Sequence, residues 1–157
     1  MEELLHIRPA TIEDAKMLFE WRNDVETRRM SGSTAPLSWE GHLEWFNKTL
    51  SGGFPGRNVY IVEFSRGDPV GTVRSDERTD GFTEVSYTVS PAWRGKGLGK
   101  RMVTQFAREH LRGKKLAARI KKGANPASEA IASALGLKPY SEGHSDDPNE
   151  PSTVEWR

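Results

Sequence analysis

The sequence predicts a single α/β (α+β) domain in which helices flank one mixed, mostly antiparallel twisted sheet of about six or seven strands. The chain has 157 residues, a length that fits one domain with a real hydrophobic core. Short runs of alternating apolar and polar residues, typical of strands, occupy its middle, and segments with helical spacing lie before and after them. One helical segment joins two of the strands, which makes those strands parallel neighbours.

The first third of the chain is predicted to hold one strand and two or three helices. The strand at 4–9 ends at a proline, and Thr11 with Asp14 forms a capping pattern for the next helix. The polar stretch 21–29 ends that helix and begins a short one, and 32–36 is a loop. Ser38 caps a further helix that runs to about residue 50.

The remaining elements alternate between strands and helices. Strands at 59–64 and 70–74 form a hairpin, and a polar loop at 75–81 leads to a strand at 84–89. A helix at 98–111 and a strand at 116–120 follow. Asn125 and Pro126 then open a helix that Gly136 ends, with a buried side of Ala127, Ala130, Ile131, Ala134 and Leu135. Short strands at 137–140 and, at the sheet edge, 154–157 enclose an acidic loop at 142–151.

Composition excludes several classes of function. The formal net charge is +1, which gives no overall field for nucleic acid or an anionic membrane, and the basic run at 114–122 is interpreted as a solvated strand surface. Without cysteine there is no disulfide and no thiolate nucleophile, and the four histidines are too dispersed for a metal motif. No segment reaches transmembrane length, and the acidic start is not typical of a signal peptide. We expect a cytoplasmic protein with no metal, no nucleic-acid partner and no membrane partner.

The segment 89–101 joins a strand to a helix through three glycines at alternate positions. Gly95, Gly97 and Gly99 carry no Cβ, so several backbone amides can converge on one ligand. The helix that begins directly after Gly97 points its unpaired N–H groups to the same place. Lys100 and Arg101 add positive charge, which opposes the helix dipole and is better explained if an anion binds there. The segment therefore predicts a phosphate site.

Two familiar phosphate motifs do not match this segment. A P-loop needs four residues between its first glycine and Gly-Lys-Ser/Thr, but Gly95 has only three before Gly99 and Lys100. A dinucleotide fingerprint needs Gly-x-Gly-x-x-Gly, and its last position is Lys100 or Met102 here. Neither a nucleoside triphosphate nor a dinucleotide is therefore expected.

What remains, Arg94-x-x-Gly97-x-Gly99, resembles the acetyl-coenzyme A signature Arg/Gln-x-x-Gly-x-Gly/Ala of the GCN5-related N-acetyltransferase (GNAT) family, and the resemblance covers nearly the whole chain. Asn125-x-x-Ser128 is similar to a second segment of that family. The resemblance implies the GNAT fold, with a splay between the fourth and fifth strands that holds the pantetheine arm. The coenzyme contacts that it implies are Val89, Arg94, Gly95, Lys96, Gly97, Leu98, Gly99, Lys100, Asn125 and Ser128. Asn125 is equally well explained as a helix cap alone.

The resemblance also implies an acetyl-CoA-dependent N-acetyltransferase, in which a primary amine attacks the thioester directly in a ternary complex. Glu84 stands where many members carry the acid that accepts the amine proton, and the backbone of Val89 is expected to bind the thioester carbonyl. A solvated strand glutamate explains Glu84 nearly as well. Many relatives have a tyrosine at the position of Ala132, so the proton donor for the thiolate stays open among Ser128, Tyr87, Tyr140 and water.

Residues 21–24 and 38–46 look like the GNAT branch that acetylates nucleotide-linked amino sugars, and ribosomal-protein N-terminal acetyltransferases share parts of this pattern. Arg22, Asn23, His42 and Tyr87 are the candidate acceptor residues. A nucleotide-linked amino sugar is the expected small-molecule acceptor, and a protein N-terminus is the alternative. A coenzyme-binding sensor without catalysis is a third hypothesis, because Ala132 replaces the tyrosine. Monomer and homodimer both stay open.

Overall fold

The computed structural model describes residues 3–30, 35–123, 125–143 and 152–157. One seven-stranded sheet runs through the molecule in the order β1-β2-β3-β4-β5-β7-β6. The strands are β1 (Leu5–Pro9), β2 (Arg57–Phe64), β3 (Pro69–Glu77), β4 (Phe82–Val89), β5 (Lys115–Lys121), β6 (Pro139–Gly143) and β7 (Thr153–Trp156). All neighbours are antiparallel except β4 and β5, which are parallel. The predicted fold class is confirmed.

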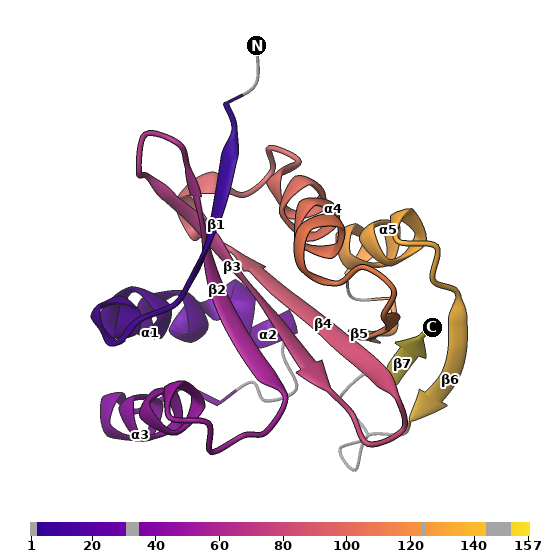
Figure 1. Cartoon of the computed structure of the whole chain (residues 1–157), viewed down its shortest axis with the longest axis horizontal. Helices are drawn as coiled ribbons and strands as arrows, with labels where there is room; N and C mark the ends of the chain where they lie inside the picture. Colours follow the sequence, from indigo (N-terminus) through magenta and orange to yellow (C-terminus); the bar gives the residue numbers. More distant parts are fainter. Residues whose placement is uncertain (1–2, 31–34, 124, 144–151) are drawn as a thin grey trace.

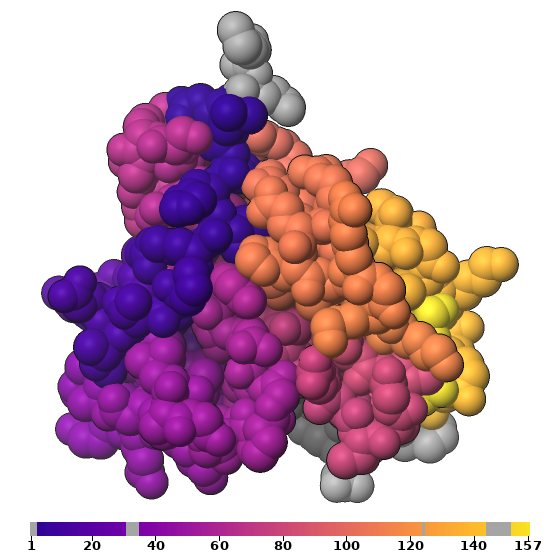
Figure 2. Space-filling model, in the orientation of Figure 1, coloured from indigo at the N-terminus to yellow at the C-terminus, as the bar shows by residue number. Residues whose placement is uncertain are grey.

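Helices cover both faces of this sheet. They are α1 (Ala15–Asn23), α2 (Val25–Met30), α3 (Trp39–Leu50), α4 (Leu98–His110) and α5 (Pro126–Ala134). Figure 1 shows α1, α2 and α3 on one side of the sheet and α4 and α5 on the other. In the space-filling view α5 lies next to α4, with the β7–β6 end of the sheet beside it (Figure 2). We call the two sides the α1–α3 face and the α4–α5 face.

Each face has its own hydrophobic core. Met102 and Phe106 of α4 are fully buried against strand residues such as Val62 on the α4–α5 face. Trp21 and Ile61 belong to a separate cluster on the α1–α3 face. Because successive strand side chains point to opposite faces, Ile61 and Val62 serve different cores. Burial of each such side chain stabilises the fold by about 1.5–3 kcal/mol.

The parallel pair β4 and β5 is short. Phe82–Glu84 lies against Lys115–Ala117, and within the described residues the two strands are not paired beyond this point. β4 nevertheless continues to Val89, and β5 pairs from Ala118 onward with β7 on its other side. The two strands therefore diverge after three pairs, as the family resemblance implied.

Side-chain caps begin two of the helices where the sequence predicted them. Ser38 Oγ accepts the N–H of Gly41 at 3.1 Å at the start of α3. Asn125 Oδ1 accepts the N–H of Ser128 at 3.1 Å at the start of α5. Gly136, directly after α5, has a φ of +84°, which only glycine adopts without strain, so α5 ends there.

Some predicted boundaries were wrong. Residues 75–77 belong to β3 and not to a loop, because Asp76 is held by Arg57 on the neighbouring strand. β7 lies inside the sheet and not at its edge, because β6 pairs along its outer side. β6 itself begins two residues later than predicted, at Pro139. In α5 the predicted alanines 127, 130 and 134 are exposed, because the helix turns Ile131 and Ala132 inward. The predicted loops at 32–36 and 142–151 lie mostly outside the described residues.

Two general observations apply to the described part of the chain. None of its helices combines the length and the apolar character that crossing a membrane requires. The longest, α4, has 13 residues. In the same residues, no three acidic or histidine side chains come together in a way that could hold a metal ion.

Candidate active site

The glycine-rich segment enters α4 through left-handed backbone. Gly95 has a φ of +75° and Gly97, directly before α4, has a φ of +73°. A Cβ built on either glycine would meet no atom within 4 Å, so the backbone faces open space there. The first turn of α4 carries no acid, and the side chains of Lys96 and Lys100 are exposed. Unpaired N–H groups, the helix dipole and nearby lysines suit this helix start to a phosphate group.

The first turn of α4 rests directly on the end of β4. Leu98 is 4% exposed, so its backbone alone can contact a ligand. A Cβ on Gly99 would lie 3.0 Å from the ring of Tyr87, 3.3 Å from Ile131 and 3.4 Å from Val89. The third glycine is therefore needed for close packing, and this packing places the start of α4 beside the diverging strands.

Arg94, the first residue of the family signature, is bound from the corner between α1 and α2. Its Nη2 donates to Asp24 Oδ2 and, at 2.8 Å, to Thr27 Oγ1. The Arg94 guanidinium holds the pKa of Asp24 below its usual value. This contact ties the glycine segment to the α1–α2 corner, whereas the contact of Arg94 with the coenzyme stays a prediction.

A pocket of about 100 Å³ lies where β4 and β5 diverge. Ser86 and Tyr87 line it from β4, Arg119 from β5, and Ser128 and Ala132 from α5. Tyr87 Oη and Ser128 Oγ are hydrogen-bonded at 2.8 Å, which joins β4 to α5. Burial raises the pKa of the Tyr87 phenol, and the hydrogen bond with Ser128 partly offsets this rise. The phenol is therefore protonated at neutral pH and can donate a proton in this pocket.

Three further residues bear on the alternatives that the sequence left open. Asn125 caps α5, as described above, and its contact with the coenzyme stays a prediction. Ala132 is 2% exposed and brings no hydroxyl to the pocket. Tyr140 is 62% exposed on β6, where the guanidinium of Arg157 lies 4.0 Å from its ring centre, and it does not line the pocket. Of the side-chain hydroxyls considered as proton donors, Tyr87 and Ser128 are the two that line the pocket.

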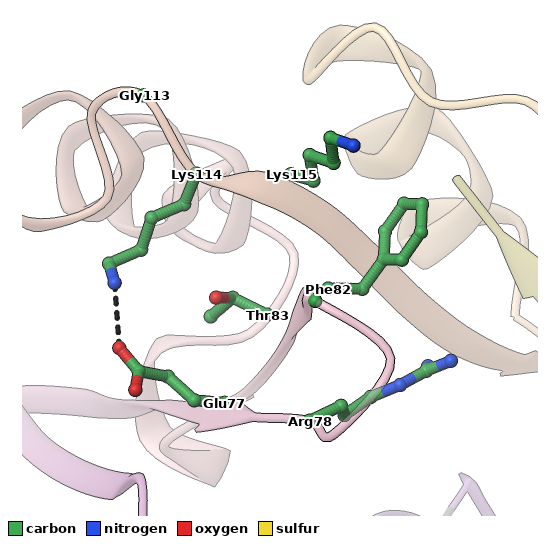
Figure 3. A pocket seen from close by; sticks show the side chains of 8 residues that line it. Glu77, Arg78, Phe82, Thr83, Gly113, Lys114 and Lys115 are labelled. Atoms are coloured by element: carbon green, nitrogen blue, oxygen red, sulfur yellow. Dashed lines mark hydrogen bonds and ion pairs between the residues drawn. The ribbon is translucent and has the colours of Figure 1, made fainter.

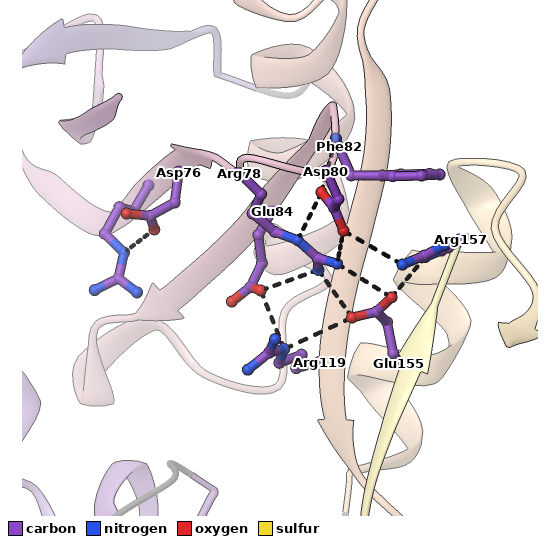
Figure 4. A network of polar contacts seen from close by, with 9 residues as sticks. Asp76, Arg78, Asp80, Phe82, Glu84, Arg119, Glu155 and Arg157 are labelled. Carbon is purple, nitrogen blue, oxygen red and sulfur yellow. Dashed lines mark hydrogen bonds and ion pairs between the residues drawn. The ribbon is translucent and has the colours of Figure 1, made fainter. Parts of the chain in front are cut away.

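Glu84 is the last residue of β4 that pairs with β5. Its side chain belongs to an ion-pair network (Figure 4). Its Oε1 lies 3.5 Å from Arg78 Nη1 and 3.2 Å from Arg119 Nε. Glu155 of β7 pairs with Arg78 at 2.8 Å, and this arginine holds the pKa of Glu155 below its usual value. The Glu84 side chain is 21% exposed, so it is a network residue at the point where β4 and β5 part and not a solvated strand residue. Its role as a base stays a prediction.

Two of the candidate acceptor residues, Arg22 and His42, contact each other between α1 and α3. The Nε2–H of His42 donates to the Ala15 carbonyl at 2.7 Å, and its Nδ1 accepts from Arg22 Nη1 at 2.8 Å. Burial lowers the pKa of His42, the bond to Ala15 opposes this, and the charge of Arg22 lowers it further. His42 is 1% exposed, so the prediction that it contacts the acceptor does not fit, and it orients Arg22 instead. Asn23 Oδ1 accepts the N–H of Leu37 at 2.9 Å and holds the segment before α3.

A larger pocket of about 420 Å³ lies at the opposite end of β4 (Figure 3). Phe82, the first residue of β4, lines it, together with Glu77 and Lys114. Lys114 Nζ is already paired with Glu77 at 2.6 Å. Val89 lies seven positions after Phe82 on this strand, or about 23 Å away, so this pocket is remote from the glycine segment. The smaller pocket is the better candidate for the active site.

Three further polar residues near the site were not predicted from the sequence: Arg57, Arg74 and Ser86. Asp76 Oδ1 accepts from Arg57 Nε at 2.6 Å, and Asp76 Oδ2 accepts from Arg74 Nε at 2.8 Å. Arg74 is the cross-strand partner of Ser86. The strand alternation could have indicated them. Val73 is buried on the α4–α5 face, so the polar side chains that alternate with such residues lie together on the α1–α3 face.

A glycine-rich helix start suited to phosphate, beside a splayed parallel strand pair, defines the class, an N-acetyltransferase fold. The chain matches the model of the acetyltransferase (GNAT) domain family over residues 5–138. Because this match spans most of the sequence, the chain belongs to the GNAT acetyltransferase family. Comparison with curated protein sequences gives no match.

Several solved structures share the fold. Spermidine N-acetyltransferase from Vibrio cholerae, solved with CoA and spermine, is 14% identical, with a TM-score of 0.82 over 97% of this chain and 93% of that chain. The yncA protein from Salmonella typhimurium, solved with acetyl-CoA, is 21% identical, with a TM-score of 0.75 over 98% and 92%. Aminoglycoside acetyltransferase AAC(6')-Ib, solved with coenzyme A, is 18% identical, with a TM-score of 0.74 over 98% and 94%. At these identities the likeness establishes the fold.

Proposed function

We propose that this protein transfers the acetyl group of acetyl-CoA to a primary amine, which attacks the thioester directly in a ternary complex. The observation that carries the proposal is the divergence of β4 from β5 beside the glycine start of α4. A ligand whose phosphates bind at that helix start can extend a long arm between the two strands. Membership of the GNAT family supports this donor, as do neighbours solved with CoA or acetyl-CoA.

The residues present fit this donor. The backbone of Gly95, Gly97 and the first turn of α4 would hold the pyrophosphate. The backbone of β4 near Val89, which β3 pairs on one side and β5 does not pair on the other, would bind the arm and the thioester carbonyl. When bound, acetyl-CoA supplies a thioester that an amine can attack. The pocket of about 100 Å³ is smaller than most ligand pockets, so Tyr87 and Ser128 separate when the arm enters.

The chain also carries groups for the two proton transfers. The amine must be neutral to attack, and Glu84, at the point where β4 and β5 part, accepts its proton. Because Arg78 and Arg119 already hold this carboxylate, we propose that the proton passes through a water molecule. Tyr87 protonates the leaving thiolate, since its phenol keeps its proton at neutral pH and Ala132 offers none.

For the acceptor we propose a nucleotide-linked amino sugar, with a protein N-terminus as the alternative. Support comes from the pattern at 21–24 and 38–46 and from the arginines on the α1–α3 face. The neighbours named for spermidine and for aminoglycosides indicate that acceptors vary widely on this fold. The hydroxyls of Tyr87 and Ser128 in the pocket favour an enzyme over a non-catalytic sensor. A cytoplasmic location and a monomeric or dimeric state are proposed with it.

A thiol-release assay with acetyl-CoA tests the function. The acceptor panel contains a UDP-linked amino sugar, a peptide with a free N-terminus, spermidine and an aminoglycoside. We expect turnover with at least one amine, which mass spectrometry identifies by a gain of one acetyl group. Binding of acetyl-CoA without turnover across the panel would favour the sensor, and an absence of binding would overturn the donor assignment.

Replacement of Glu84 tests the proposed base. Glu84→Gln should lower kcat about 100-fold, because proton transfer loses its acceptor, and should leave the Kd for CoA unchanged. Glu155→Gln is the matched control, since it removes a carboxylate from the same ion-pair network. Equal losses of kcat in both variants would assign Glu84 a structural role.

A further inference from the structure

The α1–α3 face carries more positive than negative charge beside the candidate active site. Arg57 and Arg74 share one acid, Asp76. Arg22 of α1 is close enough to both arginines for their charges to lower its pKa, in addition to the larger effect of its own burial. Asp76 is therefore the acid that this group of three guanidinium groups shares. The neighbouring carboxylate, Glu84, is the cross-strand partner of Asp76 but is already paired with Arg78 and Arg119, so among the described residues the group keeps an excess of positive charge.

Arg22 is the arginine of this group that has no acidic partner within the described part of the chain. One of its nitrogens, Nη1, donates to His42 Nδ1 at 2.8 Å, and its guanidinium carbon lies 3.9 Å from the ring centre of Trp45. His42 cannot supply a negative charge, because it is neutral and its other nitrogen donates to the Ala15 carbonyl. Removing a cation from water without a counter-ion is costly, so this position calls for an anion.

The contacts of Arg22 also prepare it to bind. Stacking on Trp45 and the bond to His42 hold the planar guanidinium in one orientation, so less side-chain entropy is lost when a ligand arrives. His42 is itself fixed by its burial and by Ala15. A guanidinium held in this way can present its remaining N–H groups to two oxygens of a carboxylate or phosphate.

The group lies one strand away from the splay. Arg74 and Ser86 are direct cross-strand partners on β3 and β4, and Ser86 lines the pocket between β4 and β5. Adjacent strands are about 4.8 Å apart. Ser86 Oγ is buried and has no hydrogen-bond partner in the described residues, so the Ser86 hydroxyl beside Arg74 is a further donor that a ligand could use.

We propose that Arg22 and Arg74, with the hydroxyl of Ser86, bind an oxyanion of the acceptor, so that the preferred substrate is an amine that carries a carboxylate or phosphate. This inference rests on the proposed acetyltransferase function. The same charges repel a polyamine, since a cationic acceptor would meet uncompensated guanidinium groups. The acceptor class would then differ from spermidine, for which the Vibrio cholerae neighbour is named.

Matched acceptor pairs test the proposal. Glucosamine 6-phosphate is compared with glucosamine, and an amino acid with its amide, so that phosphate and carboxylate are tested separately; spermidine is the cationic reference. We expect at least one anionic member to have a kcat/KM about 10-fold or more above its uncharged partner. Equal values within both pairs, or faster turnover of spermidine, would overturn the proposal and leave the acetyltransferase function standing.

Variants then locate the effect. Arg22→Gln should raise KM for the preferred anionic acceptor about 10- to 100-fold, with kcat and the uncharged partner nearly unchanged, and Arg22→Lys should restore part of the loss. Arg112→Gln, which makes the same charge change at the far end of α4, is the control. An unchanged preference in Arg22→Gln would contradict the assignment. If Arg22→Gln does not fold, Arg74→Gln takes its place.

A binding measurement covers the case in which no amine is turned over. Inorganic phosphate and acetate are titrated against the wild type and Arg22→Gln, both saturated with CoA so that the proposed phosphate site at the start of α4 is occupied, and thermal unfolding is followed. One of the two anions should raise the Tm of the wild type and not that of the variant, because binding to the folded state stabilises it. Equal shifts, or no shift in either protein, would overturn the anion site independently of catalysis.

Discussion

The two faces of the sheet solve recognition in different ways. On the α4–α5 face the proposed ligand-binding groups are backbone amides, presented by glycines whose missing side chains leave space. On the α1–α3 face they are long charged side chains, such as Arg22 and Arg74, held by contacts among several elements. A backbone site is common to every chain with the same local pattern, whereas a side-chain site can change one residue at a time. The identity of the acetyl donor can therefore be predicted from a family signature, whereas the identity of the acceptor amine cannot.

The largest effect is expected on CoA binding, when a side chain fills the open space at Gly97. Gly97→Glu adds a side chain, a backbone strain at positive φ and a charge that repels phosphate, so the Kd for CoA should rise at least 100-fold by calorimetry. Gly113→Glu is the matched control, since Gly113 has a φ of +76° and open space but follows the other end of α4. Equal losses in both variants would refute the phosphate site.

The next largest effect is expected on kcat, from loss of the Tyr87 phenol. Tyr87→Phe removes the proposed proton donor and should lower kcat about 100-fold, with little change in the Kd for CoA. Tyr60→Phe is the control, because Tyr60 packs on the same core cluster and its ring lies at a tilt against Phe106. If kcat is unchanged at neutral pH, water or Ser128 protonates the thiolate.

A moderate effect on stability is expected from the packing of β3 against β4 and α4. A Cβ on Gly71 of β3 would lie 2.5 Å from both the Thr88 carbonyl oxygen and Met102 Cε, so Gly71→Ala should lower the free energy of unfolding by about 1–3 kcal/mol in a denaturant titration. Gly143→Ala on strand β6 is the control. Its Cβ would approach the Thr153 carbonyl oxygen no closer than 3.7 Å, so a smaller loss is expected. Similar losses would contradict this explanation.

The smallest effect is expected on the acceptor side, from His42. Its folded pKa is depressed below the ordinary 6.5, chiefly by burial, so the unfolded chain binds more protons as the pH falls below that value. Stability should therefore be complete above pH 6.5 and decrease as the pH falls through the folded pKa. His42→Gln should flatten this dependence in thermal unfolding between pH 7 and 5. A variant with the wild-type slope would assign the dependence to another group.

Local patterns allowed most of the fold to be predicted. Caps at Ser38 and Asn125, the strand alternation and the helical crossover each depend on a few neighbouring residues, and the structure agrees with them. Predictions failed where partners are distant in sequence. Residues 75–77 are a strand because of Arg57, and β7 is internal because β6 pairs outside it.

The candidate site divides in the same way. The glycines before α4 could be recognised from spacing alone, whereas the state of His42 depends on Ala15 and Arg22, which lie 27 and 20 positions away. The pairing of Arg74 with Ser86 depends on strand register, which no single segment specifies. Side chains that meet through register and packing need the folded chain.

The place of β7 inside the sheet has a consequence for the order of folding. β7 supplies the neighbour along which β5 continues after it leaves β4, and Glu155 of β7 bonds to Arg78, 77 positions earlier. Contacts with such long sequence separation form slowly, because a large loop must close first. During synthesis, one wall of the donor opening therefore stays incomplete until residues 153–156 have left the ribosome, so the active site should be among the last parts of the molecule to mature.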